Sequence, residues 1–368
     1  MINILVMISQ ALLYGALAVL IGTFVMHLVP KAYRPDYAVP TNVLLGCVGI
    51  IPIATFMPII NVVAYIKPQY ELIEALTIVL TTYTIGLAWI FIVLIAVIAF
   101  FLILLVERID KQTHKGFAFL QLVLTIAIIG MVGWSSHAGS INVVLGTISD
   151  FIHLLSVSIW VGTVVVIAWF SITTTNWSKF LVWYSVLAAT CLGATAVSGF
   201  LLADVLINNY VNGWIVSYGQ GIFIKHLFII PLIIYAALNG FFVKYKLTVD
   251  EHFSPVKGAK AESIILFIIL VVTAIFTQSS PPHGAYLTEG AISPLFKLFF
   301  DSSSITSMSV LKFAPSGIAI IFVFTSMLFF AANVVAYIKR APIWMMILSS
   351  VLLVISVYLI FMFSVVLR

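Results

Sequence analysis

Four histidines are the residues of this sequence best suited to bind a metal: His137, His153, His226 and His283. His137 and His283 fall at the ends of long apolar segments. His153 and His226 each fall about six residues inside such a segment, or about 9 Å at 1.5 Å per helical residue. Counting the segments alternately across a membrane places all four on the outer side. We therefore predict that four imidazoles, distant along the chain, occupy one layer just beneath the outer surface.

Ionisable side chains within a membrane usually face the interior of a helix bundle and mark a pathway or a site. Imidazole is a common ligand of copper, zinc, iron and nickel. The four histidines thus predict a metal site, provided that their helices touch. The alternative is that they only form hydrogen bonds in the core. His27, His114 and His252 fall on the opposite side, and we expect them to be interfacial or loop residues.

Three neighbours have the right spacing to support such a site. Asp150 precedes His153 by three residues, which places both on one helix face, and its carboxylate could orient the imidazole or simply mark the aqueous rim. Trp160 follows by seven residues on that face, where it packs either on the site or in the core. Lys225 adjoins His226, and it either pairs with a carboxylate such as Asp150 or extends to the interface.

The elements that must position these residues are apolar helices. A membrane span needs about 20 mostly apolar residues. The segments that qualify are 4–29, 42–66, 76–106, 117–136, 147–171, 179–203, 220–243, 262–279, 315–338 and 342–367. We predict an all-α, polytopic transmembrane bundle of about ten helices, with a single transmembrane domain over 1–368. Pro52 and Pro58 should kink the second helix, because each removes a backbone donor.

Composition supports the same class. Hydrophobic residues make up 63% of the chain and charged residues only 8%, whereas soluble domains carry about 25% charged residues. The net charge of +5 comes from loop residues that act as topology signals, so no nucleic-acid partner is expected. Membrane lipid is therefore the expected surroundings of most of the chain, and its main non-covalent partner.

Lysine and arginine set the predicted orientation, because cytoplasmic loops carry an excess of both. One side of the predicted bundle carries most of them, and this side should be cytoplasmic. Both termini are then extracytoplasmic, in an inner or plasma membrane. The basic residues of this side are Lys31, Arg34, Arg108, Lys111, Lys115, Lys179, Lys244, Lys246, Lys257, Lys260, Lys339 and Arg340.

Several chemistries have no motif in the sequence. It contains no phosphate-binding glycine–lysine loop, no dinucleotide fingerprint, no HExxH and no CxxCH. Its two cysteines, Cys47 and Cys191, both lie in apolar stretches and do not form a disulfide framework. We therefore expect a protein that is not an enzyme.

The residues around His153 resemble a known family. The string Asp150-Phe-Ile-His153-Leu-Leu-Ser-Val-Ser-Ile-Trp160-Val-Gly162 is similar to the motif of CopD-type copper resistance and copper transport membrane proteins. Thr163 departs from the family, which commonly has a second glycine there. His226 is not part of the family pattern. Further similar features are Ser136-His137-Ala138, Ser198-Gly199, Lys225, Ala237-Leu238-Asn239 and the turn Pro281-Pro282.

The resemblance implies copper handling between the outer compartment and the cytoplasm, often beside a small soluble CopC-like copper-binding protein. Some relatives, such as the YcnJ-like proteins, carry a fused CopC-like domain, which we expect this chain to lack. The resemblance covers about residues 70–285, as a CopD-like core between flanking helices 1–66 and 315–367.

We therefore expect copper import from the outer face through a site of His137 and His153, completed by His226 or His283. Three alternatives remain open. The histidines of facing helices could bind haem in an electron-transfer protein. The protein could be a metallochaperone that delivers copper to an oxidase. Finally, the histidines could serve only as hydrogen-bonding residues in a transporter of another solute.

Overall fold

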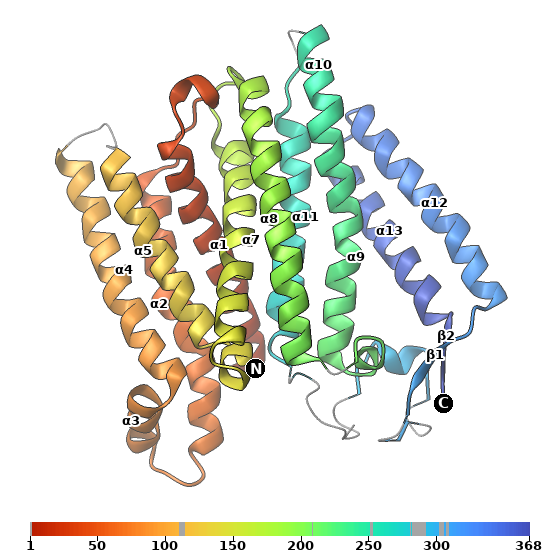
Figure 1. The fold of residues 1–368 in the computed structure, drawn as a ribbon, viewed down its shortest axis with the longest axis horizontal. Coiled ribbons are helices and arrows are strands. Elements are labelled where there is room, and N and C mark those ends of the chain that lie inside the picture. Colours follow the sequence, from red (N-terminus) through yellow and green to blue (C-terminus); the bar gives the residue numbers. More distant parts are fainter. Residues whose placement is uncertain are drawn as a thin grey trace. The chain divides into compact units, whose positions relative to one another are not determined.

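A computed structural model gives the fold (Figure 1). It describes residues 2–109, 115–207, 209–250, 253–279, 281, 292–301, 305–306 and 309–368. Ten helices among these residues are long and apolar enough to cross a membrane. The prediction of an all-α, multi-pass bundle is therefore confirmed, and a chain that crosses ten times has both termini on one side.

The chain divides into two compact units, Met1–Val205 and Leu206–Arg368. The prediction of a CopD-like core near 70–285 is not tested by this division. The elements of the first unit are α1 (Ile2–Leu28), η1 (Lys31–Tyr33), α2 (Thr41–Ile66), α3 (Leu72–Thr82), α4 (Thr84–Ile109), α5 (Lys115–Trp134), α6 (His137–Ile141), α7 (Leu145–Phe170) and α8 (Trp177–Leu206).

Helix α1 lies at the centre of the first unit, where it packs against α2, α5 and α7. Its contact with α7 is unusually close, because small residues face each other. A Cβ atom added to Gly162 would lie 1.9 Å from the carbonyl oxygen of Ala18, and one added to Gly22 would lie 2.1 Å from the carbonyl carbon of Gly162. Small residues allow such approaches between membrane helices. α7 is thereby fixed against the core of the unit.

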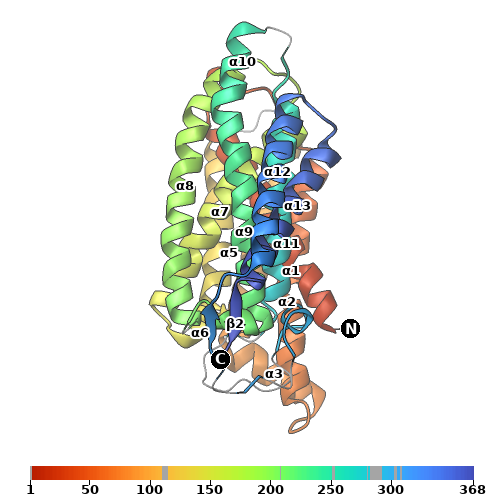
Figure 2. The ribbon, with the colours of Figure 1, turned by 90° about the vertical axis from the view of Figure 1, so that its right-hand side faces the viewer.

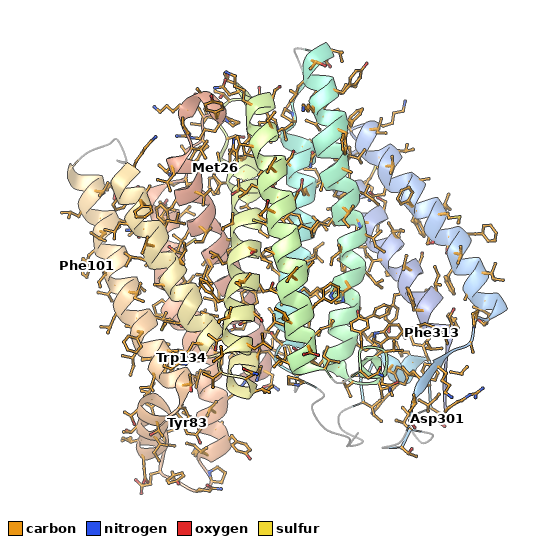
Figure 3. All side chains as sticks on the ribbon, in the orientation of Figure 1. Met26, Tyr83, Phe101, Trp134, Asp301 and Phe313 are labelled. Carbon is orange, nitrogen blue, oxygen red and sulfur yellow. The ribbon has the colours of Figure 1, made fainter. Side chains whose placement is uncertain are left out.

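The third predicted helix, 76–106, differs in the structure. A break at Tyr83, whose backbone is extended (φ −84°, ψ 140°), separates the short α3 from the membrane-length α4. α3 packs against α2 and α4, and Figure 3 shows Tyr83 at the turn between α3 and α4. The structure therefore divides the predicted segment 76–106 between the short apolar helix α3 and the third span, α4.

The second unit is built around α9, which packs on α11 and α13. Figure 2 shows α12 and α13 one beside the other. The strands β1 and β2 pair antiparallel, with Lys312 opposite Val366, and so join the start of α12 to the end of α13. The elements are η2 (Asn212–Ile215), α9 (Ser217–Ala237), η3 (Leu238–Val243), α10 (Lys244–Val249), α11 (Val256–Phe276), η5 (Phe296–Leu298), β1 (Leu311–Phe313), α12 (Gly317–Ile338), α13 (Ile343–Met362) and β2 (Val365–Leu367).

Each unit carries its described basic residues mainly at one end. In the first unit, Lys31 and Arg34 follow α1, Lys115 begins α5, and Lys179 lies at the start of α8. In the second unit, the basic end consists of α10, the start of α11 and the turn after α12. Lys111, His114 and His252 lie outside the described residues.

Candidate metal site

His153 lies on α7, eight residues after Leu145, or about 12 Å along the helix. Its half-buried ring lies against α8. The Nδ1 atom is 3.1 Å from the backbone oxygen of Thr195 and 3.2 Å from the hydroxyl of Ser198. A Cβ atom added to Gly199 would lie 3.4 Å from Cε1 of the ring. Three residues within little more than one turn of α8 thus contact one imidazole.

These contacts decide which nitrogen of His153 carries the proton. A backbone carbonyl can only accept, so Nδ1–H must donate to Thr195. The hydroxyl of Ser198 already donates to Ala194, at 2.7 Å, and therefore also accepts from the imidazole. In the neutral ring the lone pair is then on Nε2. This arrangement, with one nitrogen tied to a carbonyl and the other basic, is typical of metal-binding histidines.

A cleft of about 500 Å³ lies between α7 and α8, beside this histidine. Its lining is mainly apolar, but it includes Ser149 and Ser198. The hydroxyls of Ser149 and Thr195 are buried without a hydrogen-bond partner among the described residues. Buried hydroxyls without partners are uncommon in proteins. The neighbourhood of His153 therefore contains polar groups with capacity for a further polar occupant.

His137 is the first residue of α6, the short helix between α5 and α7. The hydroxyl of Ser136 caps this helix by accepting from the Gly139 N–H at 3.1 Å. The side chain of His137 is exposed and has a polar partner. α6 packs on α7, and Figure 3 shows Trp134 at the end of α5, just before this turn. His137 thus lies at the loop end of α7, near the start of the helix that carries His153.

The predicted supporting residues of α7 take different positions. Asp150 is half-buried and has a polar or charged partner. Trp160 is only 4% exposed, and its indole N–H has no hydrogen-bond partner among the described residues. Thr163 replaces the glycine of the family motif. It is fully buried, and its hydroxyl donates to the Ile159 carbonyl at 2.7 Å within α7.

His226 lies on α9 in the second unit, nine residues after Ser217. Its Nδ1 atom is 2.7 Å from the hydroxyl of Tyr210. Burial raises the pKa of Tyr210 to about 12, so this hydroxyl stays protonated at neutral pH. A hydroxyl can donate or accept, so the tautomer of His226 is not fixed in the way that of His153 is. Lys225 lies 5.9 Å from the ring centre of Phe276.

The four histidines are distributed over both units and the part of the chain that the structure does not describe. His137 and His153 belong to the first unit, His226 belongs to the second, and His283 lies outside the described residues. Within the described part of the chain, no three His, Cys, Asp or Glu side chains form a group that could hold a metal ion. The shared four-histidine site stays a prediction.

Sequence reasoning missed two sets of partners. The carbonyl of Thr195 leaves no trace in the sequence, because any residue supplies a backbone oxygen. Tyr210 was missed because it lies in a connection rather than in a predicted span. A polar residue in the inner half of an apolar segment is the signal that finds Asn239, whose amide donates to Glu262 of α11.

Comparison with known proteins agrees with the residue pattern. The sequence model described as "Copper resistance protein D" matches residues 178–276, and that described as "Copper resistance protein D-like, N-terminal domain" matches residues 1–147. No solved structure matches the chain.

A curated relative points the same way. The copper transport protein CutJ of Bacillus subtilis (strain 168) is 26% identical over 190 residues, which are 48% of this chain and 34% of the relative. The match therefore spans about a third of the relative's length. Both family matches and the motif around His153 lead to one conclusion: the chain belongs to the CopD-type family of copper resistance membrane proteins.

Proposed function

We propose that this protein handles copper, and that it imports copper from the outer face through a site anchored by His153. The observation that carries the proposal is the Thr195 carbonyl, which accepts from Nδ1 and leaves Nε2 of His153 as the basic nitrogen. His137 is the second ligand that we propose, and His226 and His283 are candidates to complete the site. Asp150, Trp160 and Lys225 support it.

Copper is the cargo of this proposal and not a resident cofactor. The donors fit it, because imidazole binds copper well, and the hydroxyls of Ser149 and Thr195, which have no hydrogen-bond partner in the described part of the chain, offer oxygen. Inward movement of a cation is favoured by the membrane potential, at about 2.3 kcal/mol per charge per 100 mV. Uptake of a monovalent ion therefore needs no nucleotide-driven step.

The location of the site also suggests how copper arrives. The predicted outer end of the first unit contains few basic residues, so it does not repel a cation. A soluble CopC-like copper-binding protein outside the membrane is the partner that we propose for delivery. Plasma or inner-membrane lipid surrounds the bundle.

The test measures copper bound by the purified protein and copper uptake into proteoliposomes. His153→Ala should weaken copper binding at least about tenfold. Loss of a residue that only orients a ligand already lowers metal affinity about 10- to 100-fold, and this variant removes the proposed ligand itself. The matched control is His27→Ala, a histidine of α1 whose Nδ1 contacts Thr23 and Tyr37 at 2.8 Å each. That variant should keep the copper affinity.

Three results would contradict the proposal. Equal copper binding by wild type and His153→Ala would exclude His153 as the anchor. A haem absorption band in the purified protein would favour an electron-transfer role. Copper binding without uptake into proteoliposomes would favour delivery to another protein outside the membrane.

A further inference from the structure

The second unit contains a buried carboxylate that the copper site does not use. Glu262 of α11 is only 2% exposed. It lies six residues after Val256, or about 9 Å along the helix. Acidic side chains at such depth in a membrane helix are rare, and they commonly mark ion or proton pathways.

Glu262 is held by a chain of donors from two other helices. The Asn239 amide donates to its Oε2 atom at 2.6 Å, and the Tyr337 hydroxyl donates to the Asn239 oxygen. Gly258, one turn before Glu262 on α11, makes room for this arrangement. A Cβ atom there would lie 2.2 Å from the Tyr337 hydroxyl and 2.6 Å from the Asn239 oxygen.

A second polar layer lies one helical turn away on the same faces. Tyr235 is four residues before Asn239 on α9, and Asn333 is four residues before Tyr337 on α12. The Asn333 amide donates to Tyr235 at 2.9 Å and to Ser350 of α13 at 2.7 Å. Both Tyr235 and Asn333 are fully buried. The rings of Tyr235 and Tyr337 lie 5.5 Å apart, so the layers touch.

The helix that contributes Asn239 is irregular at this point. Leu238–Val243 form a π-helical segment between α9 and α10, and Asn239 is its second residue. π-helical turns are rare and occur frequently at functional sites. Here the extra residue places Asn239 next to α11 while α9 continues towards the basic end.

The polar chain reaches a small cavity at that basic end. The cavity has a volume of about 10 Å³ and is lined by residues that include Tyr337, Gly258, Lys257 and Arg340. This is about the size that holds one water molecule. The cavity thus places room for one water molecule beside Tyr337 and Gly258, which both adjoin Asn239, the residue that donates to the Glu262 carboxylate.

From these observations we propose that Glu262 is a proton-binding site, reached from the predicted cytoplasmic side and positioned by Asn239 and Tyr337. A proton from water forms an O–H bond with a carboxylate oxygen of Glu262, and the same bond breaks when the proton returns. No oxidant or reductant is needed. Burial disfavours the charged carboxylate, whereas the Asn239 amide favours it, so both states are within reach.

Several polar, charged and titratable side chains surround Glu262 or lie near it on the helices that pack around it. α9 contributes Tyr235, the π-helical segment η3 contributes Asn239, and α12 contributes Tyr337, with Arg340 just after its end. Lys257 donates to the Arg340 carbonyl at 2.6 Å, and Arg340 donates to the Ser254 carbonyl at 2.9 Å. Lys260 lies on α11 itself. The only titratable residue of α13 is Tyr358, which donates to Gln220.

The experiment labels the purified protein with a hydrophobic carbodiimide, which reacts with protonated carboxyl groups in apolar surroundings. Mass spectrometry should find the adduct on Glu262, increasing as the pH is lowered. Infrared spectroscopy should show a protonated-carboxyl band over the same pH range. Glu262→Gln should remove both signals. Glu107→Gln, the same change at an exposed residue of α4, should leave them intact.

Two outcomes would overturn the proposal. One is the absence of both the adduct and the infrared band from the wild-type protein at every pH. The other is a signal that does not change with pH, which would mean a permanently protonated, structural group. Both readouts use wild-type protein, so they remain decisive if a variant fails to fold.

A link between this proton and copper movement rests on the proposed function. If the link exists, Glu262→Gln should flatten the pH dependence of copper uptake while copper binding stays unchanged. Loss of binding in His153→Ala and loss of pH dependence in Glu262→Gln are separate results. Failure of the copper proposal would therefore leave the labelling experiment unaffected.

Discussion

At the scale of single residues, the partner of Nδ1 distinguishes the histidines. His153 faces a carbonyl, which fixes its tautomer, while His226 faces a hydroxyl that can donate or accept. Fixing the tautomer in advance removes one cost of binding a metal, because the Nδ1–H bond to the Thr195 carbonyl can stay in place. We therefore predict that His153 is the stronger ligand of the two.

A substitution on α8 tests whether the position of the His153 ring matters. Gly199→Leu places a side chain against Cε1, where a Cβ atom would already lie at 3.4 Å. The ring should shift, and copper affinity should fall by about 10- to 100-fold, as for other losses of ligand support. Isothermal titration of the purified protein with copper measures this.

The control for this prediction is Gly193→Leu on the same helix. It adds a leucine side chain to the lining of the cleft between α7 and α8, but a Cβ atom there meets nothing within 4 Å, the His153 ring included. Equal affinity loss in both variants would show that filling the cleft matters and that the ring position does not.

Much of the residue-level picture could be predicted from sequence. The distance of His153 from its helix start follows from counting residues along an apolar segment, at about six residues predicted against eight observed, whereas its outer side stays a prediction. Glu262 was missed because the sequence suggests a helix that begins at 262. The structure begins α11 at Val256, so that Lys257 and Lys260 lie in its first turns, at the end that the sequence predicts to be cytoplasmic.

At the scale of elements, the crossing of α1 and α7 determines where His153 lies. Gly162 is nine residues after His153 on α7, and it touches the backbone of α1 at Ala18. Because no side chain separates the two helices, α7 can neither slide nor rotate freely. A glycine within an apolar helix indicates a close approach, and the structure shows that the partner at Gly162 is α1.

Gly162→Leu should therefore force α1 and α7 apart. Overpacking of this kind costs about 1–3 kcal/mol, and here the nearest atom belongs to backbone, which cannot move aside. The midpoint of thermal unfolding in detergent should decrease. A thiol-reactive dye can report it, because Cys191 is buried and Cys47 is half-buried.

Gly46→Leu on α2 is the matched variant, since a Cβ atom at Gly46 meets nothing within 4 Å. It should unfold at nearly the wild-type temperature. An equal decrease in both variants would mean that leucine is disfavoured for reasons other than the α1–α7 contact.

Helix number and type could be predicted because membrane spans depend mainly on apolar length. The break at Tyr83 could not, because α3 is as apolar as a span and no proline or charge marks its end. When a short apolar helix of eleven residues directly precedes a membrane span, hydropathy alone reads the two helices as one longer segment.

At the scale of the whole molecule, ten crossings and basic residues define the topology. The connection between α5 and α7 should face the outside, and that between α7 and α8 should face the cytoplasm. Asn142 and Thr174 are exposed residues of these two connections. Their accessibility therefore tests the predicted orientation directly.

Cysteine substitution at these two positions gives the prediction. In intact cells, a membrane-impermeant maleimide should label Asn142→Cys and should not label Thr174→Cys. Both should react after the membrane is opened. The reverse pattern would invert the predicted orientation, and it would move His137 and His153 to the cytoplasmic side.

The π-helical segment at Leu238–Val243 also has a consequence for how this family can vary in length. Such a segment is equivalent to one extra residue absorbed into a continuous helix. Deleting Gly240, where a Cβ atom would meet nothing within 4 Å, would return the helix to its ordinary winding. Everything beyond would turn by about 100°. Lys244 and Lys246 would then point in new directions, so a single codon lost here would alter the surface of one end of the protein without opening a loop.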